Sequence, residues 1–146
     1  MAYILIKRRS KKGQPYHYLV TSVREGGKVR QRVLVYLGKY PSVEAALEGI
    51  PEDIARLRHL AARSQVNMAT IRECLGLPLP APVPRPRREG SQWANRLYSR
   101  YWYWARCGEV CEQRVAALSE KLALLQMYRS AHDSVTCETI VGTKPA

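Results

Sequence analysis

The sequence predicts an α+β protein: a small three-stranded antiparallel sheet braced by short helices, then a proline-rich linker and a long, coiled-coil-like helix. Three observations carry this prediction. A Gly-Gly pair separates two runs of strand-forming residues between Tyr16 and Gly38. Prolines alternate with other residues from Leu77 to Pro86. Apolar residues then recur at heptad spacing through residues 91–129.

The predicted sheet centres on a hairpin that turns at Gly26-Gly27. Glycine tolerates the positive φ that a two-residue hairpin turn requires. Counting outward from the turn places Tyr18 opposite Val35, and opposed residues share one face of the sheet. The face that carries Tyr18 and Val35 is rich in tyrosine and valine and is expected to be the core. Residues 3–7 supply the third strand, because they form a short apolar run that ends in a polar turn.

Short helices are expected to cover the apolar face, since three strands alone bury too little surface to be stable. Ser42 has the side chain of a helix N-cap, and apolar residues follow it at helical spacing. Gly49 and Pro51 are expected to interrupt that helix and to start a second one. A third short helix is expected to end at Gly76, which closes a first domain of residues 1–76.

Residues 77–90 form the predicted linker. Its prolines block helix and sheet and favour an extended, semi-rigid polyproline II conformation. A spacer between two folded parts is the simplest use of such a segment. Recognition by a proline-binding module is the alternative, for which composition alone argues.

Residues 91–129 are predicted to form one long helix capped by Ser91, and residues 130–146 a flexible tail. Apolar residues in the helix alternate at steps of four and three, the spacing of a coiled-coil seam. This seam predicts a homodimer through residues 91–129; the alternative is a helix that folds back on the N-terminal domain. The seam consists of Leu97, Tyr101, Trp104, Gly108, Cys111, Val115, Leu118, Leu122 and Leu125.

Positive charge is concentrated near the start of the chain. The whole sequence has a formal net charge of +12. Residues 1–40 contain ten Lys or Arg and one acidic residue, which gives +9 for this stretch. Focused positive charge is typical of a protein that binds a polyanion. A nucleic acid is therefore the expected partner, and a basic, well-solvated surface without a specific partner is the alternative.

The basic face of the hairpin is the best candidate for the binding site. An antiparallel ribbon fits the major groove of DNA, where arginine can donate two hydrogen bonds to guanine. Arg30 and Arg32 lie two residues apart and therefore point the same way, with Thr21 opposite Arg32. A merely solvated sheet face usually mixes charge signs. The predicted nucleic-acid-binding residues are Arg30, Arg32, Lys28, His17, Thr21, Lys7, Arg8, Arg9, Lys11 and Lys12.

No catalytic or metal-binding pattern stands out in the sequence. His17, His59 and His132 are isolated, and no adjacent side chain suggests a nucleophile–base pair. Cys107 and Cys111 lie one helical turn apart, a poor spacing for a closed zinc site. The sequence therefore predicts a protein with no enzymatic activity, no cofactor and no bound metal.

An aromatic run with interleaved arginines extends from Trp93 to Arg106. Such a run could stack on unpaired bases. On a helix, however, neighbouring aromatic residues point in different directions, so packing and a contact with a protein partner are the favoured interpretation.

The run YLVTSVREGGKVRQRVLVYLGKYPSVEAAL resembles the N-terminal region of bacterial insertion-sequence transposases with a DDE-type (three-acid) nuclease core. It is similar, more loosely, to the three-stranded arm-binding domains of tyrosine integrases, in which a basic sheet lies in the major groove. The resemblance covers roughly residues 3–50 and implies recognition of double-stranded DNA at the end of a mobile element. Asp53 and Asp133 are the only aspartates, so the nuclease activity is not expected to carry over.

These features together favour a non-catalytic DNA-binding protein related to mobile-element transposases. A coiled-coil assembly or adaptor protein and an RNA-binding protein are the alternatives, because charge alone does not distinguish DNA from RNA. The N-terminus lacks the charge order of an export signal, and no run reaches the roughly 20 apolar residues of a membrane span. A cytoplasmic location with no membrane contact is therefore expected.

Overall fold

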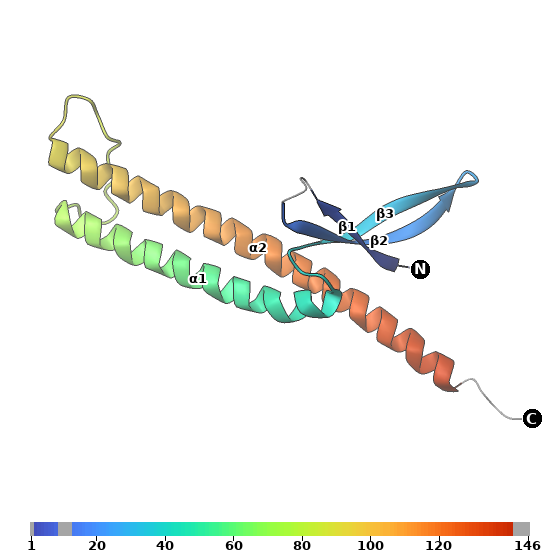
Figure 1. Ribbon diagram of the computed structural model, residues 1–146. Coiled ribbons are helices and arrows are strands. Elements are labelled where there is room, and N and C mark those ends of the chain that lie inside the picture. Colours follow the sequence, from blue (N-terminus) through green and yellow to red (C-terminus); the bar gives the residue numbers. More distant parts are fainter. Residues whose placement is uncertain (1, 9–12, 142–146) are drawn as a thin grey trace, which may run out of the picture. The chain divides into compact units, whose positions relative to one another are not determined.

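The computed structural model describes residues 2–8 and 13–141, with side chains described for residues 2–7 and 13–132. The predicted α+β class and the three-stranded antiparallel sheet are confirmed. Two helices follow the sheet, and the second is long (Figure 1). The elements are β1 (Ala2–Arg8), β2 (Pro15–Glu25), β3 (Lys28–Gly38), α1 (Val43–Cys74) and α2 (Gln92–Val141).

The chain divides into two compact units. Unit 1 contains residues 1–52 and 118–146, so it holds the sheet, the start of α1 and the end of α2. Unit 2 contains residues 53–117, which are the rest of both helices and the segment that joins them. The division cuts across both helices, whereas the sequence suggested boundaries between elements.

The sheet has the order β1-β2-β3, and its turn lies where the sequence predicts it. Gly26 and Gly27 have φ values of 58° and 77°, so both use the positive φ that favours glycine. The register is regular outward from the turn, and Thr21 lies opposite Arg32 as expected. The tip of the β2–β3 pair therefore follows directly from its local sequence.

The predicted register is wrong in the second half of this strand pair. Val20 lies opposite Val33, but Leu19 lies opposite Val35, which leaves one extra residue in β3. A second irregularity follows between His17 and Tyr18. Each extra residue disrupts the ladder locally and re-aims the side chains beyond it. Turn geometry alone does not encode such bulges.

The shifted register changes which face of the sheet is buried. Tyr18 is paired with Tyr36 and not with Val35, so Val35 moves to the face of Leu19. That face packs in the core of unit 1, while Tyr18 is only half-buried and Tyr36 is exposed. The buried residues of unit 1 are His17, Leu19, Val20, Val35, Leu37, Val43, Ala46, Ile50 and Leu125.

Helix α1 is continuous where short helices were expected. Ser42 is the N-cap, since its Oγ accepts a hydrogen bond from the Ala45 backbone N–H at 3.1 Å. Pro51 lies inside the helix, although a proline there removes one backbone hydrogen bond. Ile50 and Ile54 on either side of it are buried, and this packing offsets the loss. The predicted break at Gly49 and Pro51 is therefore absent.

The end of α1 follows the prediction. Gly76 has a φ of 63°, and its backbone N–H donates to the carbonyl of Glu73 at 3.0 Å. The N–H of Leu77 donates to the carbonyl of Arg72, also at 3.0 Å. These two bonds form a Schellman motif, which satisfies the free carbonyl groups of the last helical turn.

Unit 2 is an antiparallel pair of helices, and α2 finds its partner within the same chain (Figure 1). The predicted seam residues of α2 in this unit are buried or half-buried. A Cβ built on Gly108 would lie 3.6 Å from the Cβ of Ser64, so small residues meet where the helices are close. The facing heptad of α1, all buried or half-buried, is Ile54, Leu57, Ala61, Ser64, Met68 and Ile71.

The packing of this seam corresponds to the alternative in which α2 folds back on its own chain. A heptad pattern specifies a partner with a complementary stripe, but it does not specify whether that partner is another copy. Helix α2 also continues to Val141, beyond the predicted end at Arg129. Residues 142–146 of the predicted tail lie outside the described residues.

The proline-rich segment is fastened to the helices of unit 2. The Nη2 atom of Arg72 donates to the carbonyl groups of Pro78 and Ala81. The indole N–H of Trp102 donates to the carbonyl of Pro84 at 3.1 Å. The Asn95 side chain both accepts from the backbone N–H of Arg87 and donates to its carbonyl. The Ala81 backbone N–H also donates to the carbonyl of Pro78 at 2.9 Å, so the segment contains a turn and is held in place at several points.

Alanine substitutions at Gly108 and Gly49 are expected to have opposite effects on the stability of the fold. Gly108→Ala is expected to raise the free energy of unfolding by about 1 kcal/mol, because alanine has the higher helix propensity and its Cβ finds ordinary contact distance. Gly49→Ala is expected to lower it by about 1–3 kcal/mol, because the new Cβ would collide with the Tyr40 ring. Denaturant unfolding of both variants tests this, and an increase in both would contradict the close approach of Tyr40.

Candidate nucleic-acid interface

An exposed basic element of unit 1 is a two-stranded ribbon formed by β2 and β3. Strand β1 pairs with β2 only as far as Thr21, so residues 22–31 of β2 and β3 pair with each other alone. We call residues 22–31 the arm. The arm extends past β1 in Figure 1. Every residue from Arg24 to Leu34 is exposed. The arm is therefore accessible on both faces.

Charge on the arm is mostly positive, and one face carries most of it. The register places Lys28, Arg30 and Arg32 on the same face of β3, with Arg32 at the base of the arm. Glu25 is the one acidic residue of the arm. It lies 4.0 Å from Arg30, and both side chains are largely exposed, at 65% and 71%. Such an exposed ion pair contributes little to stability, roughly 0–1 kcal/mol. An anion that binds Arg30 more strongly can therefore displace Glu25.

The dimensions of the arm suit a major groove. Paired strands lie about 4.8 Å apart, and the groove of B-DNA is about 12 Å wide, so a ribbon enters with its side chains. Residues two apart on a strand lie about 6.8 Å apart, which is close to two base-pair steps. Arg30 and Arg32 could therefore reach separate base pairs from one face of the ribbon.

His17 does not belong to this surface. It is buried in unit 1, with an exposed fraction of 7%, and its Nδ1 lies 3.2 Å from the carbonyl oxygen of Gly38. The predicted exposed position of His17 is therefore wrong. The sequence pattern placed it correctly on the face of Thr21 and Arg32, but that face is covered by helices at this end of the sheet.

The other predicted site residues are dispersed. Thr21 is half-buried at the base of the arm. Lys7 is exposed on β1, with its Nζ 5.4 Å from the ring centroid of Tyr18. The side chain of Arg8 and the residues Arg9, Lys11 and Lys12 lie outside the described residues. The described basic residues at this end of the sheet are therefore not gathered into one cluster with Arg30.

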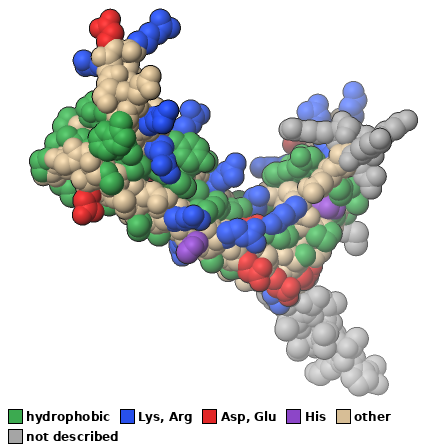
Figure 2. Space-filling view, turned by 60° about the vertical axis from the view of Figure 1, so that its left-hand side comes forward, with side chains coloured by type: hydrophobic (Ala, Val, Ile, Leu, Met, Phe, Trp, Pro, Cys, Tyr) green, Lys and Arg blue, Asp and Glu red, His purple; other side chains and the backbone are tan. Residues whose placement is uncertain are grey.

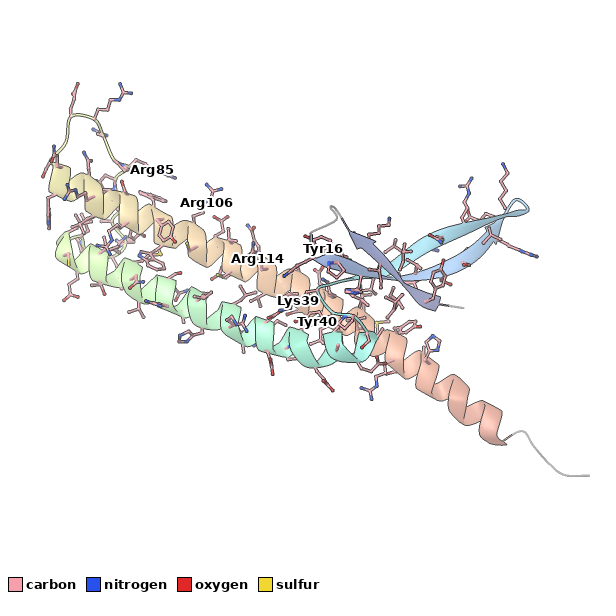
Figure 3. The ribbon with its side chains drawn as sticks, in the orientation of Figure 1. Tyr16, Lys39, Tyr40, Arg85, Arg106 and Arg114 are labelled. Atoms are coloured by element: carbon pink, nitrogen blue, oxygen red, sulfur yellow. The ribbon has the colours of Figure 1, made fainter. Side chains whose placement is uncertain are left out.

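A second basic surface lies in unit 2, and its arginines are not among the binding residues predicted from the sequence. The Arg85 guanidinium stacks 3.8 Å from the Trp102 ring centroid, and the indole is fixed by its bond to Pro84. Arg85 and Arg106, both labelled in Figure 3, line one surface groove of about 470 Å³, which Glu109 also lines. Stacked guanidinium groups keep their N–H edges available to anions. On the face seen in Figure 2, Lys and Arg side chains outnumber acidic ones.

The described side chains include no group of three His, Cys, Asp or Glu residues that could hold a metal ion. Cys74, Cys107 and Cys111 have free thiols, and the Cys137 side chain lies outside the described residues. In the described part of the chain, neither helix combines the length and the apolar character needed to cross a bilayer.

The N-terminal part of the chain is similar to a known protein family. Residues 5–70 match the N-terminal domain of IS1634 family transposases. Neither a curated protein nor a solved structure matches the chain. The matched stretch contains nearly the whole sheet, the arm and most of α1. The resemblance seen in the sequence is thereby confirmed: residues 5–70 are similar to an insertion-sequence transposase N-terminal domain.

Proposed function

We propose that this chain is a non-catalytic protein that binds double-stranded DNA by laying the arm in a major groove. The exposed, basic, two-stranded arm within the matched transposase region is the observation that carries the proposal. Arg30 and Arg32 contact base edges from one face of the ribbon. Lys28 contacts phosphates, because a lysine ammonium acts as a point charge and not as a planar fork.

The shape of the arm favours DNA over double-stranded RNA. The major groove of A-form RNA is deep and too narrow for side chains to read, whereas that of B-DNA admits a two-stranded ribbon. The arm is a ribbon with exposed arginines on one face. B-form DNA is therefore the proposed partner, and RNA binding is an outcome that the experiments below can reveal.

The assembly or adaptor alternative has less support than the sequence suggested. In unit 2 the seam of α2 packs against α1 of the same chain, with Gly108 beside Ser64. Residues that fill an internal seam do not present an apolar stripe to a partner. The absence of enzymatic activity stays a prediction from the sequence.

The first test replaces Arg30 in the arm and Arg32 at its base. Arg30→Ala/Arg32→Ala is expected to weaken duplex binding by the full chain at least ~10-fold, since each bidentate contact contributes about 1–3 kcal/mol. The matched control is Arg56→Ala/Arg63→Ala, which removes two exposed arginines from α1 and is expected to change affinity little. Fluorescence anisotropy gives the affinities, and circular dichroism checks that both variants fold. Equal losses in the two variants would remove the arm from the site.

The second test measures salt dependence. If about five phosphates are neutralised, log K for duplex binding should fall with log salt at a slope near −4.5. The same titration with a double-stranded RNA of equal length should show weaker binding. A duplex affinity that does not respond to salt, or a clear preference for RNA, would overturn the proposed partner.

The third test concerns self-association. Because the unit 2 part of the α2 seam is occupied by α1, the full chain is expected to sediment as a monomer at micromolar concentration. Analytical ultracentrifugation provides the measurement. A concentration-dependent dimer that the seam substitution Val115→Glu dissociates, with helicity retained, would restore the homodimer predicted from the heptad.

A further inference from the structure

One face of the sheet carries a group of tyrosines that the proposed duplex contact does not use. The register places Tyr3, Tyr16, Tyr18 and Tyr36 on the face opposite Leu19 and Val35. We call these four residues the tyrosine face. The sequence predicts that the face carrying Tyr18 belongs to the core. Tyr3 and Tyr36 are instead 38% and 39% exposed, and Tyr16 and Tyr18 are half-buried.

Three rings of the tyrosine face, those of Tyr16, Tyr18 and Tyr36, form a continuous aromatic surface. The Tyr36 ring centroid lies 4.9 Å from that of Tyr18 and 6.2 Å from that of Tyr16. The planes are tilted by 39° and 33°, so the rings are neither stacked face to face nor perpendicular. At the edge of the group, the Tyr3 hydroxyl accepts a hydrogen bond from the Gln31 side chain at 2.7 Å. This bond links the tyrosine face to the arm.

Lysines lie over the faces of two of these rings. The Nζ of Lys7 is 5.4 Å from the Tyr18 centroid, and the Nζ of Lys121 is 5.0 Å from the Tyr36 centroid. Lys121 is partly buried, and this desolvation lowers its pKa. A ring face that an ammonium group can cover can also be covered by a flat ligand such as a nucleobase. The lysine that the base displaces then lies close to the phosphate of the same nucleotide. Aromatic rings bordered by cations are the combination that single-stranded nucleic acids require.

We propose that the tyrosine face binds unpaired nucleotides adjoining the duplex that the arm holds. Tyr36 stacks on a base, Tyr18 extends the platform, and Lys7 and Lys121 contact the phosphates of the same strand. This proposal rests on the proposed duplex binding, because Tyr16, Tyr18 and Tyr36 lie on the two strands that form the arm. It adds a second ligand class, single-stranded DNA, on the opposite face of the ribbon from Arg30 and Arg32.

A structural role for the tyrosines does not account for the whole arrangement. Val20 is fully buried in the central strand, between Tyr3 on β1 and Val33 on β3, so tyrosines also shield the sheet from water. Shielding requires large rings, but it does not require lysines over them. Tyr36 is the most informative residue, because it contacts both Tyr16 and Tyr18 and is itself exposed.

The experiment measures binding of the full chain to a blunt duplex, to the same duplex with a five-nucleotide oligo-dT overhang, and to one with an abasic overhang. The base-bearing overhang is expected to raise affinity about 5- to 100-fold over the abasic one, as loss of base–aromatic stacking implies. Tyr36→Leu should remove that increase and leave blunt-duplex affinity unchanged, while Tyr36→Phe should retain it. The matched control is Tyr103→Leu, which alters a 62% exposed tyrosine on α2 and should retain the increase.

The outcomes separate this proposal from the duplex contact. One outcome is that the chain binds blunt duplex, that the arginine substitutions weaken this binding, and that the base-bearing overhang adds no affinity. This outcome would overturn the proposed role of the tyrosine face and leave the proposed duplex contact intact. An equal increase from the abasic overhang would also overturn it, because the attraction would then be only electrostatic, and this comparison needs no variant to fold. Absence of any duplex binding would overturn the proposed function, and an unpaired dT strand offered alone would then test the tyrosine face.

Discussion

The extra residues in β3 are the constraint on which the rest of unit 1 depends. By shifting the register past Val20, they bring Val35 and Leu37 onto the face of Leu19 and His17. The small sheet thereby acquires one face that is apolar enough to pack against the start of α1 and the end of α2. A regular ladder would instead have divided these apolar residues between the two faces, and neither face would have formed a sufficient core.

The same shift separates the two chemistries of the ribbon. Near the turn, pairing is regular, and Arg30 in the arm and Arg32 at its base share one face. Beyond the first bulge, Tyr36 joins Tyr18 on the opposite face, bordered by lysines. Because only the β1–β2–β3 part is braced by helices, the arm stays free on both sides. The core and the two candidate contact surfaces thus lie on different parts of one strand pair.

In unit 2, the apolar seam of α2 is covered by α1 of the same chain. Ser64 and Gly108 are small, so the two helices can approach closely at this point. The joining segment is held by hydrogen bonds from Arg72 and Trp102 to its carbonyl groups, which fix its path between the helix ends. The hydrogen-bonded carbonyl groups of the joining segment and the packing of the seam residues stabilise this pair of helices. It also carries the stacked Arg85, whose guanidinium remains at the surface.

The sequence alone determined the features that depend on local chemistry. These are the Gly26-Gly27 turn, the register next to it, the Ser42 cap, the Gly76 helix end, the long second helix and the transposase-like N-terminal region. Tertiary packing decided what local chemistry leaves open. It determined that helix α1 continues through Pro51, that His17 is buried, that the tyrosines lie outside the core and that α1 is the partner of the α2 seam. A bulge, a buried face and a helix partner are each selected by the removal of apolar surface from water, and that burial brings together residues far apart in the chain.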